Sequence, residues 1–414
     1  MKIAIIGSGI AGLTCAYLLN KKYDISLYEK NNYIGGHTHT HSIIENNKSF
    51  NIDSGFIVFN EDTYPNFIKL LNILNIKTEK TVMGFSIKSI SKNLEYAGNS
   101  FNSIFAQRSN LFSLSFWRML VDIIKFNKKS IMDLETLDFN TSLEEYLNSY
   151  NFSESFKNNY IYPMGAAIWS TKSELVKGMS AFFFIKFFKN HGLLKIFNRS
   201  SWYVIKNGSN QYVKKMIKDF ESKIFLNSEI NQIKRLENSV EVTIKNQEPK
   251  LYDKVIIASH SNQALDMLSD PSDLETDILG NIPYQNNSAI LHTDISVLPT
   301  RKLAWSSWNY NLDQNPKSPM AMTYNMNILQ NLKANLTYCV TLNNNELIDN
   351  KSIIKKLNYE HPLLDVKSYI AQSRKNEISG ENNTYYCGAY WHNGFHEDGV
   401  VSALEVCKNF GVGL

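Results

Sequence analysis

The beginning of the chain alternates between apolar runs and a helical repeat. Residues 2–6 (KIAII) form a short run rich in β-branched side chains, which is typical of a buried parallel strand. A glycine-rich turn follows, and the residues after it, through Leu18, have helical periodicity. Residues 24–28 read as a second strand that ends at Glu29. This order of strand, helix and strand predicts an α/β fold of the Rossmann type.

Later segments predict two interleaved units rather than two domains in series. Helical periodicity dominates residues 103–160, whereas strand patterns occupy residues 76–98 and 223–244. Apolar, strand-like runs return at 252–258 and again from residue 384. We therefore expect an α/β unit formed by residues 1–75, 205–275 and 376–414, interleaved with an α+β unit formed by residues 76–204 and 276–375.

Composition limits the class of protein. The chain has 414 residues, 43% of them hydrophobic, which is enough for a sizeable core and for two or three domains. Its 43 basic and 39 acidic side chains give a net charge of only +4, which argues against a nucleic-acid surface. The four cysteines stand far apart without a CxxC pair, so we expect a reduced, cytoplasmic protein. The opening residues do not resemble a signal peptide, and the most apolar runs, 111–126 and 178–194, carry charges at helical spacing that disfavour a membrane span.

The glycine-rich turn has the spacing of a dinucleotide-binding motif. Gly7 permits a tight turn, Gly9 lets backbone amides approach a pyrophosphate, and Gly12 allows a helix to pack closely on a strand. Glu29 lies about 20 residues further on, where an acid can accept hydrogen bonds from a ribose. The alternative is a strand–turn–helix whose glycines serve packing only. The binding hypothesis adds three neighbours to the site, Ile10, Ala11 and Lys30.

A second glycine pair narrows the choice of cofactor. Gly35 and Gly36 follow shortly after Glu29. With this pair, the opening of the chain resembles the flavin-containing amine oxidoreductase superfamily, which includes amine oxidases and phytoene desaturases. The resemblance implies noncovalently bound FAD. The superfamily usually has an arginine near the glycine pair, where this chain has His37. Further residues that the resemblance places at the cofactor are Gly55, Phe56 and Ile57.

Eight stretches along the chain carry a narrower resemblance. They occur in order, from YPMGAAIWS (162–170) and FKNHGLL (188–194) to HPLLD (361–365) and CGAYWHNGFHEDG (387–399). Together they are similar to a bacterial branch of the superfamily, the predicted NAD/FAD-binding proteins that are often encoded beside cyclopropane-fatty-acid synthase-like enzymes. The branch implies a hydrophobic, fatty-acyl or lipid-related substrate. It makes a lipid-modifying methyltransferase a candidate partner and the inner face of a membrane a candidate location.

The same resemblance places the crowded segment GAYWHNGFHEDGVV (388–401) at the flavin. Residues 399–406 begin the last helix, whose N-terminal amides point at the ring and favour negative charge there. His396 stands where amine oxidases carry an aromatic wall of the substrate site. It either orients substrate or moves a proton, or it bonds the backbone near the helix start. Glu397 and Asp398 belong to this cofactor cap and are expected to cap the helix rather than to react. The other residues assigned here are Tyr390 and Trp391, as walls or as packing, and Gly388 and Gly399 at the cofactor.

Amine oxidases also carry a lysine, on a strand of the substrate unit, that reaches the flavin through water. The matching strand, AILHTDISVLP (289–299), has His292 and Asp294 on one face instead. These two residues are candidate catalytic groups, and the missing lysine weighs against amine oxidation. Three functions stay open: an FAD-dependent oxidoreductase acting on an acyl-chain substrate, an amine oxidase, and a flavin-binding protein without turnover.

Two further stretches have two interpretations each. HTHTH (37–41) alternates histidines as a metal site might, but no carboxylate or cysteine cluster completes the ligands, so we favour a strand beside the flavin and expect no metal. Residues 180–197 mix six phenylalanines with lysines, and Arg199 follows. They form either a helix lying in a membrane interface or a core helix that lines the substrate cavity. Because the two side-chain classes are only partly segregated, we favour the core helix.

Overall fold

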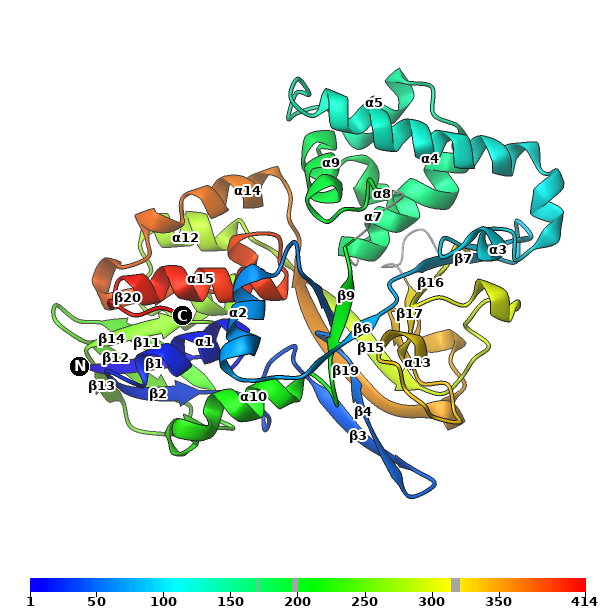
Figure 1. Ribbon diagram of the computed structural model, residues 1–414. Helices are drawn as coiled ribbons and strands as arrows, with labels where there is room; N and C mark the ends of the chain where they lie inside the picture. The colour runs from blue at the N-terminus through cyan, green and yellow to red at the C-terminus, as the bar shows by residue number, and fades with distance from the viewer. Residues whose placement is uncertain (170, 196–199, 314–320) are drawn as a thin grey trace.

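A five-stranded parallel sheet forms one end of the molecule in the computed structural model, which describes residues 1–169, 171–195, 200–313 and 321–414 (Figure 1). The predicted opening is confirmed, because α1 (Ile10–Leu19) connects β1 (Lys2–Ile6) to the parallel strand β2 (Asp24–Tyr28). The strand order in this sheet is β10 (Ile224–Phe225), β2 (Asp24–Tyr28), β1 (Lys2–Ile6), β14 (Lys254–Ile257) and β20 (Thr384–Tyr386).

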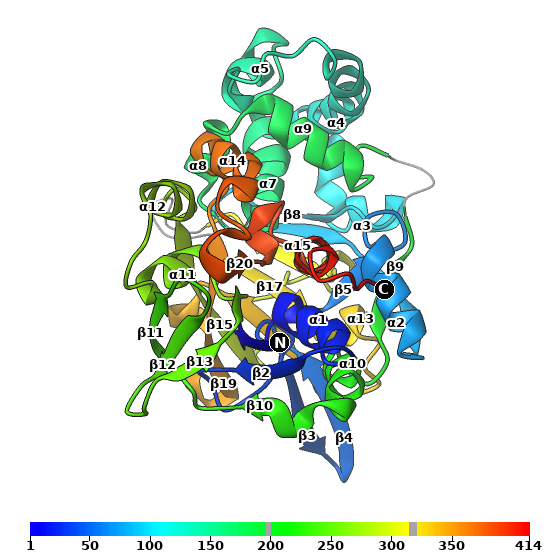
Figure 2. The same ribbon diagram turned by 90° about the vertical axis from the view of Figure 1, so that its left-hand side faces the viewer.

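The two faces of this sheet are covered differently. Ile3, Ile5 and Leu27 point to one face and share a core with α1, α2 (Pro65–Ile73), α10 (Asn210–Met216) and α15 (His396–Lys408). Figure 2 shows α1 and α15 side by side on this face. Ala4 and Val255 point to the other face. The elements that pack there are β11 (Ile230–Arg235), β12 (Val240–Ile244), β13 (Lys250–Tyr252), α11 (Ser261–Met267), α12 (Asp273–Gly280) and α14 (Val366–Ser373).

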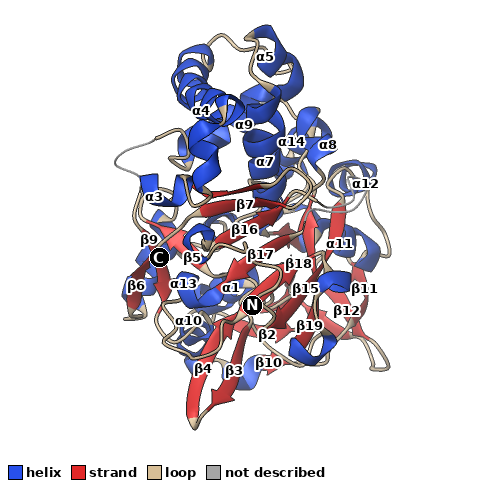
Figure 3. Ribbon diagram, turned by 90° about the vertical axis from the view of Figure 1, so that its right-hand side faces the viewer, coloured by secondary structure: helices blue, strands red, loops and turns tan. Residues whose placement is uncertain are grey.

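A seven-stranded sheet forms the other end, below a layer of helices (Figure 3). Its order is β19 (Ile353–Pro362), β15 (Tyr284–His292), β18 (Cys339–Leu342), β17 (Met322–Asn325), β16 (Trp308–Asn311), β7 (Phe85–Ser89) and β8 (Leu94–Ala97). Neighbouring strands are antiparallel except β16 and β7. The helices on this side are α3 (Phe101–Ile104), α4 (Leu114–Asp133), α5 (Leu143–Ser149), α6 (Glu154–Phe156), α7 (Tyr162–Trp169), α8 (Ser173–Lys177) and α9 (Ala181–Asn190), and α13 (Met326–Leu329) follows β17.

Two small β elements lie between the ends. One is the hairpin of β3 (Thr40–Glu45) and β4 (Lys48–Asp53). In the other, β9 (Trp202–Ile205) pairs with β5 (Val58–Asn60) and β6 (Thr78–Thr81). The predicted boundaries near residues 75 and 205 fall at this second element. The boundary at 376 falls just after α14, which packs with the α/β end.

α9 lies in the core of the helical layer. Its residues Phe184, Ile185 and Phe188 are buried in a core that is mainly aromatic, whereas Lys186 and Lys189 are exposed. This burial agrees with the core-helix interpretation of residues 180–197. The last of the six phenylalanines, Phe197, and the following Arg199 lie outside the described residues. Of the helices in the described ranges, none is both long and apolar enough to cross a membrane.

Candidate active site

A cavity of about 1400 Å³ extends from the parallel sheet to the helical layer. One section lies beyond the carboxyl ends of β1 and β14, where open α/β sheets bind ligands. The other lies between the seven-stranded sheet and the helices α7 and α9. The predicted site residues that line the cavity are Gly7, Gly9, Ile10, Ala11, Glu29, Lys30, Gly35, Gly36, His37, Gly55, Phe56, Ile57, Gly388, Tyr390 and His396.

Glycines shape the turn between β1 and α1. Gly7 has a φ of +101°, and a β-carbon there would lie 2.9 Å from the carbonyl oxygen of Ala258. A β-carbon on Gly12 would lie 1.9 Å from the carbonyl oxygen of Gly7, so only glycine lets the helix lie this close to the turn. Gly9 differs, because it lines the cavity and a β-carbon there would meet no atom within 4 Å. The first turn of α1 has no acidic side chain, and its amides lack helical partners, so this section suits an anion.

Glu29 is buried at the end of β2 in the same section. One carboxylate oxygen accepts hydrogen bonds from the amide and the hydroxyl of Ser8, at 3.0 and 2.6 Å, and the other accepts from the amide of Asn31 at 2.9 Å. These bonds fix the carboxylate where a ribose can be received. The sequence analysis missed several residues that line the cavity beside Glu29, because their segments read only as strands: Ser228, Glu229, Ile230, Asn231 and Lys245.

Two more glycines let separate loops meet at the cavity. Gly36 has a φ of +58°, and its β-carbon would lie 3.1 Å from the α-carbon of Gly9. At Gly55 a β-carbon would lie 2.1 Å from the carbonyl oxygen of His37. That carbonyl accepts a hydrogen bond from the amide of Phe56 at 2.7 Å. The close crossing at Gly55 holds His37 in the wall of the cavity.

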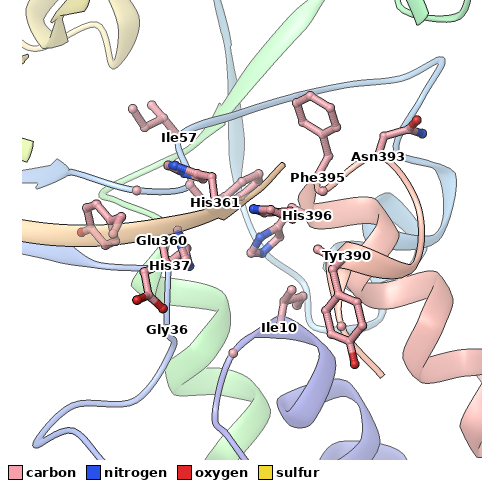
Figure 4. A pocket seen from close by; sticks show the side chains of 18 of the residues that line it. Ile10, Gly36, His37, Ile57, Glu360, His361, Tyr390, Asn393, Phe395 and His396 are labelled. Atoms are coloured by element: carbon pink, nitrogen blue, oxygen red, sulfur yellow. The ribbon is translucent and has the colours of Figure 1, made fainter. Parts of the chain in front are cut away.

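His37 lies in a group of titratable side chains that the sequence analysis did not bring together. Its ring centroid lies 5.4 Å from that of His361 and 6.3 Å from that of His260. The Nδ1 atom of His260 lies 2.8 Å from the carboxylate of Glu360. Burial and neighbouring imidazoles lower the pKa of His37, and they lower the pKa of His361 to about 4. Figure 4 shows His37, Glu360 and His361 together on one side of the pocket.

The three histidines of the HTHTH stretch have different partners, although the rings of His39 and His41 are neighbours with centroids 4.2 Å apart. His37 lines the cavity, whereas the ring of His39 stacks on Tyr33 with centroids 4.1 Å apart. The Nε2 atom of His41 lies 2.8 Å from the hydroxyl of Ser54. Within the described ranges, no group of three or more His, Cys, Asp or Glu side chains is arranged to hold a metal ion.

His396 is the first residue of α15 and lines the cavity. Its ring stacks on that of Phe56, with centroids 3.7 Å apart, and meets the ring of Phe67 edge-on. Its Nε2 atom lies 2.8 Å from the hydroxyl of Tyr212, which lies 2.5 Å from the hydroxyl of Thr38. Its partner is therefore a side chain rather than the backbone. Burial lowers the pKa of His396 to about 3, so the imidazole is neutral.

α15 begins three residues before the predicted start at Gly399. The amide of Gly399 donates to the carbonyl oxygen of Phe395 at 3.2 Å, so it is not available to a cofactor. Gly399 instead lets α15 approach α1, because a β-carbon there would lie 2.6 Å from the side chain of Ile10. Asp398 caps the helix as predicted, accepting a hydrogen bond from the amide of Phe395 at 2.8 Å.

Three other predicted residues surround this helix start. Glu397 does not cap α15. It accepts hydrogen bonds from the amides of Asn66 and Phe67, at 3.0 and 2.8 Å, and so caps the start of α2. Trp391 is buried and packs in the core on the far face of the parallel sheet, outside the cavity lining. Tyr390 belongs to the same core but lines the cavity.

The strand that was expected to carry catalytic groups is β15. Its first residues reach the cavity, whereas its last residue, His292, lies at the opposite end. The Nε2 atom of His292 lies 2.7 Å from the hydroxyl of Thr341, and Asp294, beyond the strand, accepts hydrogen bonds from two backbone amides. Neither lines the cavity, whereas Tyr284 and Asn286 do. Since a strand rises about 3.3 Å per residue, the two ends of β15 are roughly 26 Å apart. The assignment of His292 and Asp294 to catalysis is corrected accordingly, and both stabilise the far end of the sheet.

Comparison with known proteins decides the family. The model of the family described as flavin containing amine oxidoreductase matches residues 10–310. The chain belongs to this family. The curated proteins contain no match to it.

Solved structures with the same fold extend over the whole chain. A variant of putrescine oxidase has a TM-score of 0.69 at 13% identity, and a CLA-producing fatty acid isomerase from P. acnes has 0.68 at 15% identity; both alignments cover 99% of this chain and 98% of that chain. Cyclohexylamine oxidase from Brevibacterium oxydans has a TM-score of 0.66 at 12% identity and covers 99% of each chain. At these identities the likeness shows the fold, a Rossmann-type FAD-binding domain with a substrate domain.

This flavin-containing amine oxidoreductase uses FAD, and the residues present fit that group. The open space at Gly9 lies where a pyrophosphate would meet the first amides of α1, and Glu29 would receive the ribose. The ring would lie toward Tyr390 and His396. The Cys387 thiol is buried and does not line the cavity, which agrees with noncovalent binding. When bound, FAD supplies a hydride acceptor.

The section of the cavity beside the helical layer is mainly apolar and aromatic, and it includes the imidazole of His191, whose ring stacks on that of Phe187 with centroids 3.9 Å apart. Within the part of the chain that the structure describes, no charged residue of α7, α9, β7, β16 or β17 lines it. Its walls are formed by Phe85, Met164, Ile168, Trp169, Phe187, Phe188, Trp308, Tyr324 and Phe395.

Proposed function

We propose that this flavin-dependent oxidoreductase removes a hydride from a hydrophobic, acyl-chain substrate. The aromatic section of the cavity carries the proposal, because an acyl chain gains about 0.8 kcal/mol for each buried methylene and offers no charge to such walls. The same fold in a CLA-producing fatty acid isomerase supports this substrate class.

Removal of a hydride from a saturated carbon pair also releases a proton, which needs a base. The imidazoles of His361 and His396 line the cavity, and burial lowers the pKa of both, so they are neutral at physiological pH. Either imidazole can relay the proton to water, but with so low a pKa neither keeps it, so both side chains end the step neutral. A lipid-modifying methyltransferase as partner stays a prediction from the narrower resemblance.

Amine oxidation is the second candidate. Putrescine oxidase and cyclohexylamine oxidase share the fold, and the family description names amines. A protonated amine would lose its hydration in the aromatic section, and no acidic residue of the surrounding α7, α9, β7, β16 or β17 lines that section to replace it. The strand that carries a lysine in amine oxidases has Asn286 at the cavity here.

One matched pair of compounds separates the candidates. Oleic acid and oleylamine have the same chain and differ in head group. The purified yellow protein is mixed anaerobically with each compound, and the flavin absorbance is followed. We expect oleic acid or an oleoyl ester to bleach the flavin and oleylamine to leave it oxidised. Bleaching by the amine alone would favour amine oxidation, and no bleaching by any compound would favour a flavin protein without turnover.

A variant in the aromatic section tests the same proposal. Ile168→Gln places an amide against the acyl chain and should slow flavin reduction about tenfold or more, because the polar group loses its water there. Its flavin content should stay unchanged, since Ile168 lines the section remote from the glycine-rich turn. Ile44→Gln, at an exposed position far from the cavity lining, is the matched control.

A further inference from the structure

α4 has a second apolar face, which is exposed. Its buried face includes Phe116, Met119 and Phe126. Helices of globular proteins normally have one apolar stripe, directed at the core. On α4 a second stripe follows at helical spacing, with exposed fractions of 40% or more: Leu114 at 88%, Trp117 at 40%, Val121 at 56%, Ile124 at 45% and Ile131 at 44%.

The exposed stripe continues into the segment before α4. Phe112, at the end of a short helical turn (Arg108–Phe112), is 88% exposed, and Phe101 at the start of α3 is 72% exposed. Trp117 of α4 contacts both preceding segments. Its ring centroid lies 5.2 Å from that of Phe105, and its Nε1–H donates to the carbonyl oxygen of Leu111 at 2.9 Å. We call the exposed side chains of this surface the apolar patch: Phe101, Phe112, Leu114, Trp117, Val121, Ile124 and Ile131.

Basic side chains stand beside the apolar patch in a separate row. At about 100° per residue, the stripe on α4 spans roughly 100° of the helix, and Arg118, Lys125 and Lys129 occupy the adjacent 40° or so. Lys128 is exposed within the stripe. Residues 101–133 contain five basic side chains and two acidic ones. The buried Asp122 pairs with Arg118 at 3.5 Å, and Asp133, at the end of α4, pairs with Lys129 at 3.1 Å. The surface keeps a net positive charge, and Lys125 and Lys128 are its exposed basic side chains without an acidic partner on α4.

In sequence, the apolar patch begins close to residues that line the cavity. In space, it lies at the edge of the molecule. Tyr96 and Gly98 line the cavity, and Phe101 follows three residues later. α3 and α4 lie on the outer side of the helical layer, away from the parallel sheet (Figures 1 and 3).

We infer that the apolar patch and the basic row dock the protein on an anionic bilayer surface. The patch enters the boundary between head groups and acyl chains, and the basic row meets the lipid phosphates. An exposed apolar stripe beside a basic row is what interfacial helices have, whereas the apolar side chains of α9 face the core and only polar ones are exposed. A second copy of the chain fits less well, because pairing the patch with itself would bring two positive rows together. The inference concerns a surface outside the cavity and does not depend on the substrate.

Vesicle binding of the FAD-loaded protein tests the inference. The protein is sedimented with vesicles of phosphatidylcholine containing about one-third phosphatidylglycerol, and with phosphatidylcholine alone. We expect binding to the anionic vesicles that weakens as the salt rises from about 0.05 to about 0.5 M. The double substitution Phe112→Ser and Leu114→Ser should weaken binding at least tenfold, as should Lys125→Gln with Lys128→Gln.

Matched controls keep the outcome clear. Ile44→Ser with Leu251→Ser removes two exposed apolar side chains elsewhere, and Lys186→Gln with Lys189→Gln removes two charges from α9; neither pair should change binding. Flavin content and light scattering are recorded for every variant. The inference is overturned if the protein ignores anionic vesicles, or if the α4 variants bind as well as their controls. It is also overturned if the patch proves to hold two copies together, so that the apolar substitutions turn a dimer into a monomer without affecting vesicles.

Discussion

The imidazole of His396 is held on several sides at the start of α15. It stacks on Phe56, meets Phe67 edge-on, and shares a hydrogen bond with the hydroxyl of Tyr212. Because burial lowers its pKa to about 3, its charge does not change across the range in which flavoenzymes work. The side chain is therefore suited to a fixed neutral role, as a wall with one directed nitrogen.

The substitution His396→Phe isolates that nitrogen. Phenylalanine keeps the stacking on Phe56 and loses the hydrogen bond to Tyr212, so flavin content should stay near that of the parent. The rate of anaerobic flavin reduction should fall about tenfold or more if the imidazole meets the substrate. Tyr212→Phe removes the same hydrogen bond from the other side and serves as the control. A reduction rate unchanged in His396→Phe, or flavin lost from it entirely, would contradict the role.

At the scale of elements, two glycines at the turn between β1 and α1 have different roles, one in packing and one in leaving space for the cofactor. Gly12 is needed by the fold, because a β-carbon there would lie 1.9 Å from the carbonyl oxygen of Gly7. Gly9 is not needed by the fold, because its neighbourhood is open and its φ of −66° is allowed for any residue. The open space at Gly9 is thus a property of the cofactor site alone.

This difference predicts opposite outcomes for two substitutions. Gly9→Val should fold with a far-ultraviolet spectrum like that of the parent but should be purified without FAD, because the side chain fills the place of the pyrophosphate. Gly12→Val should be insoluble or strongly destabilised whether or not FAD is added. Flavin content and thermal unfolding of both variants are the measurements. A yellow Gly9→Val protein would show that the pyrophosphate lies elsewhere.

The elements that the sequence predicted correctly are those encoded by residues close together in the chain. The strand, the glycine turn and the first helix are encoded within about 30 adjacent residues, so their spacing alone indicates the nucleotide-binding unit. The group around His37 could not be found this way, because His260 and His361 come from segments more than 200 residues away whose own patterns are ordinary. The start of α15 was misplaced because Gly399 reads as a helix start, whereas its actual role is close contact with α1. The catalytic use of β15 was assigned to the wrong end, since a strand pattern does not say which end faces a cavity.

At the scale of the whole molecule, all nine histidines are half-buried or buried. Eight of the nine have a pKa lowered from its ordinary value of 6.5, chiefly by burial. Two buried acids act in the opposite sense, because burial raises the pKa of Asp53 and of Asp398 to about 6. Histidines outnumber these acids, so proton uptake on unfolding dominates below pH 6.5.

Stability should therefore fall as the pH falls through this window. A histidine with a folded pKa near 4 and an unfolded pKa of 6.5 stabilises the native state above 6.5, and this contribution is lost progressively as the pH falls toward 4. Asp53 and Asp398 offset part of the loss, because as the pH falls the folded protein binds their protons near pH 6, whereas the unfolded chain binds them only near 3.8. Near pH 5, the five histidines with a folded pKa of about 3 or 4 and the two acids together take up about three protons net on unfolding, and the other lowered histidines add to this uptake. The urea midpoint of the protein, measured with excess FAD at pH values from about 8 to about 4.5, should be level above pH 7 and should decline steeply below 6.5. His292→Gln removes one of these histidines outside the cavity, so the midpoint of this variant should decline less steeply with falling pH than that of the parent. If the variant declines as steeply as the parent, or if the midpoint of the parent does not decline, these histidines are protonated in the folded protein.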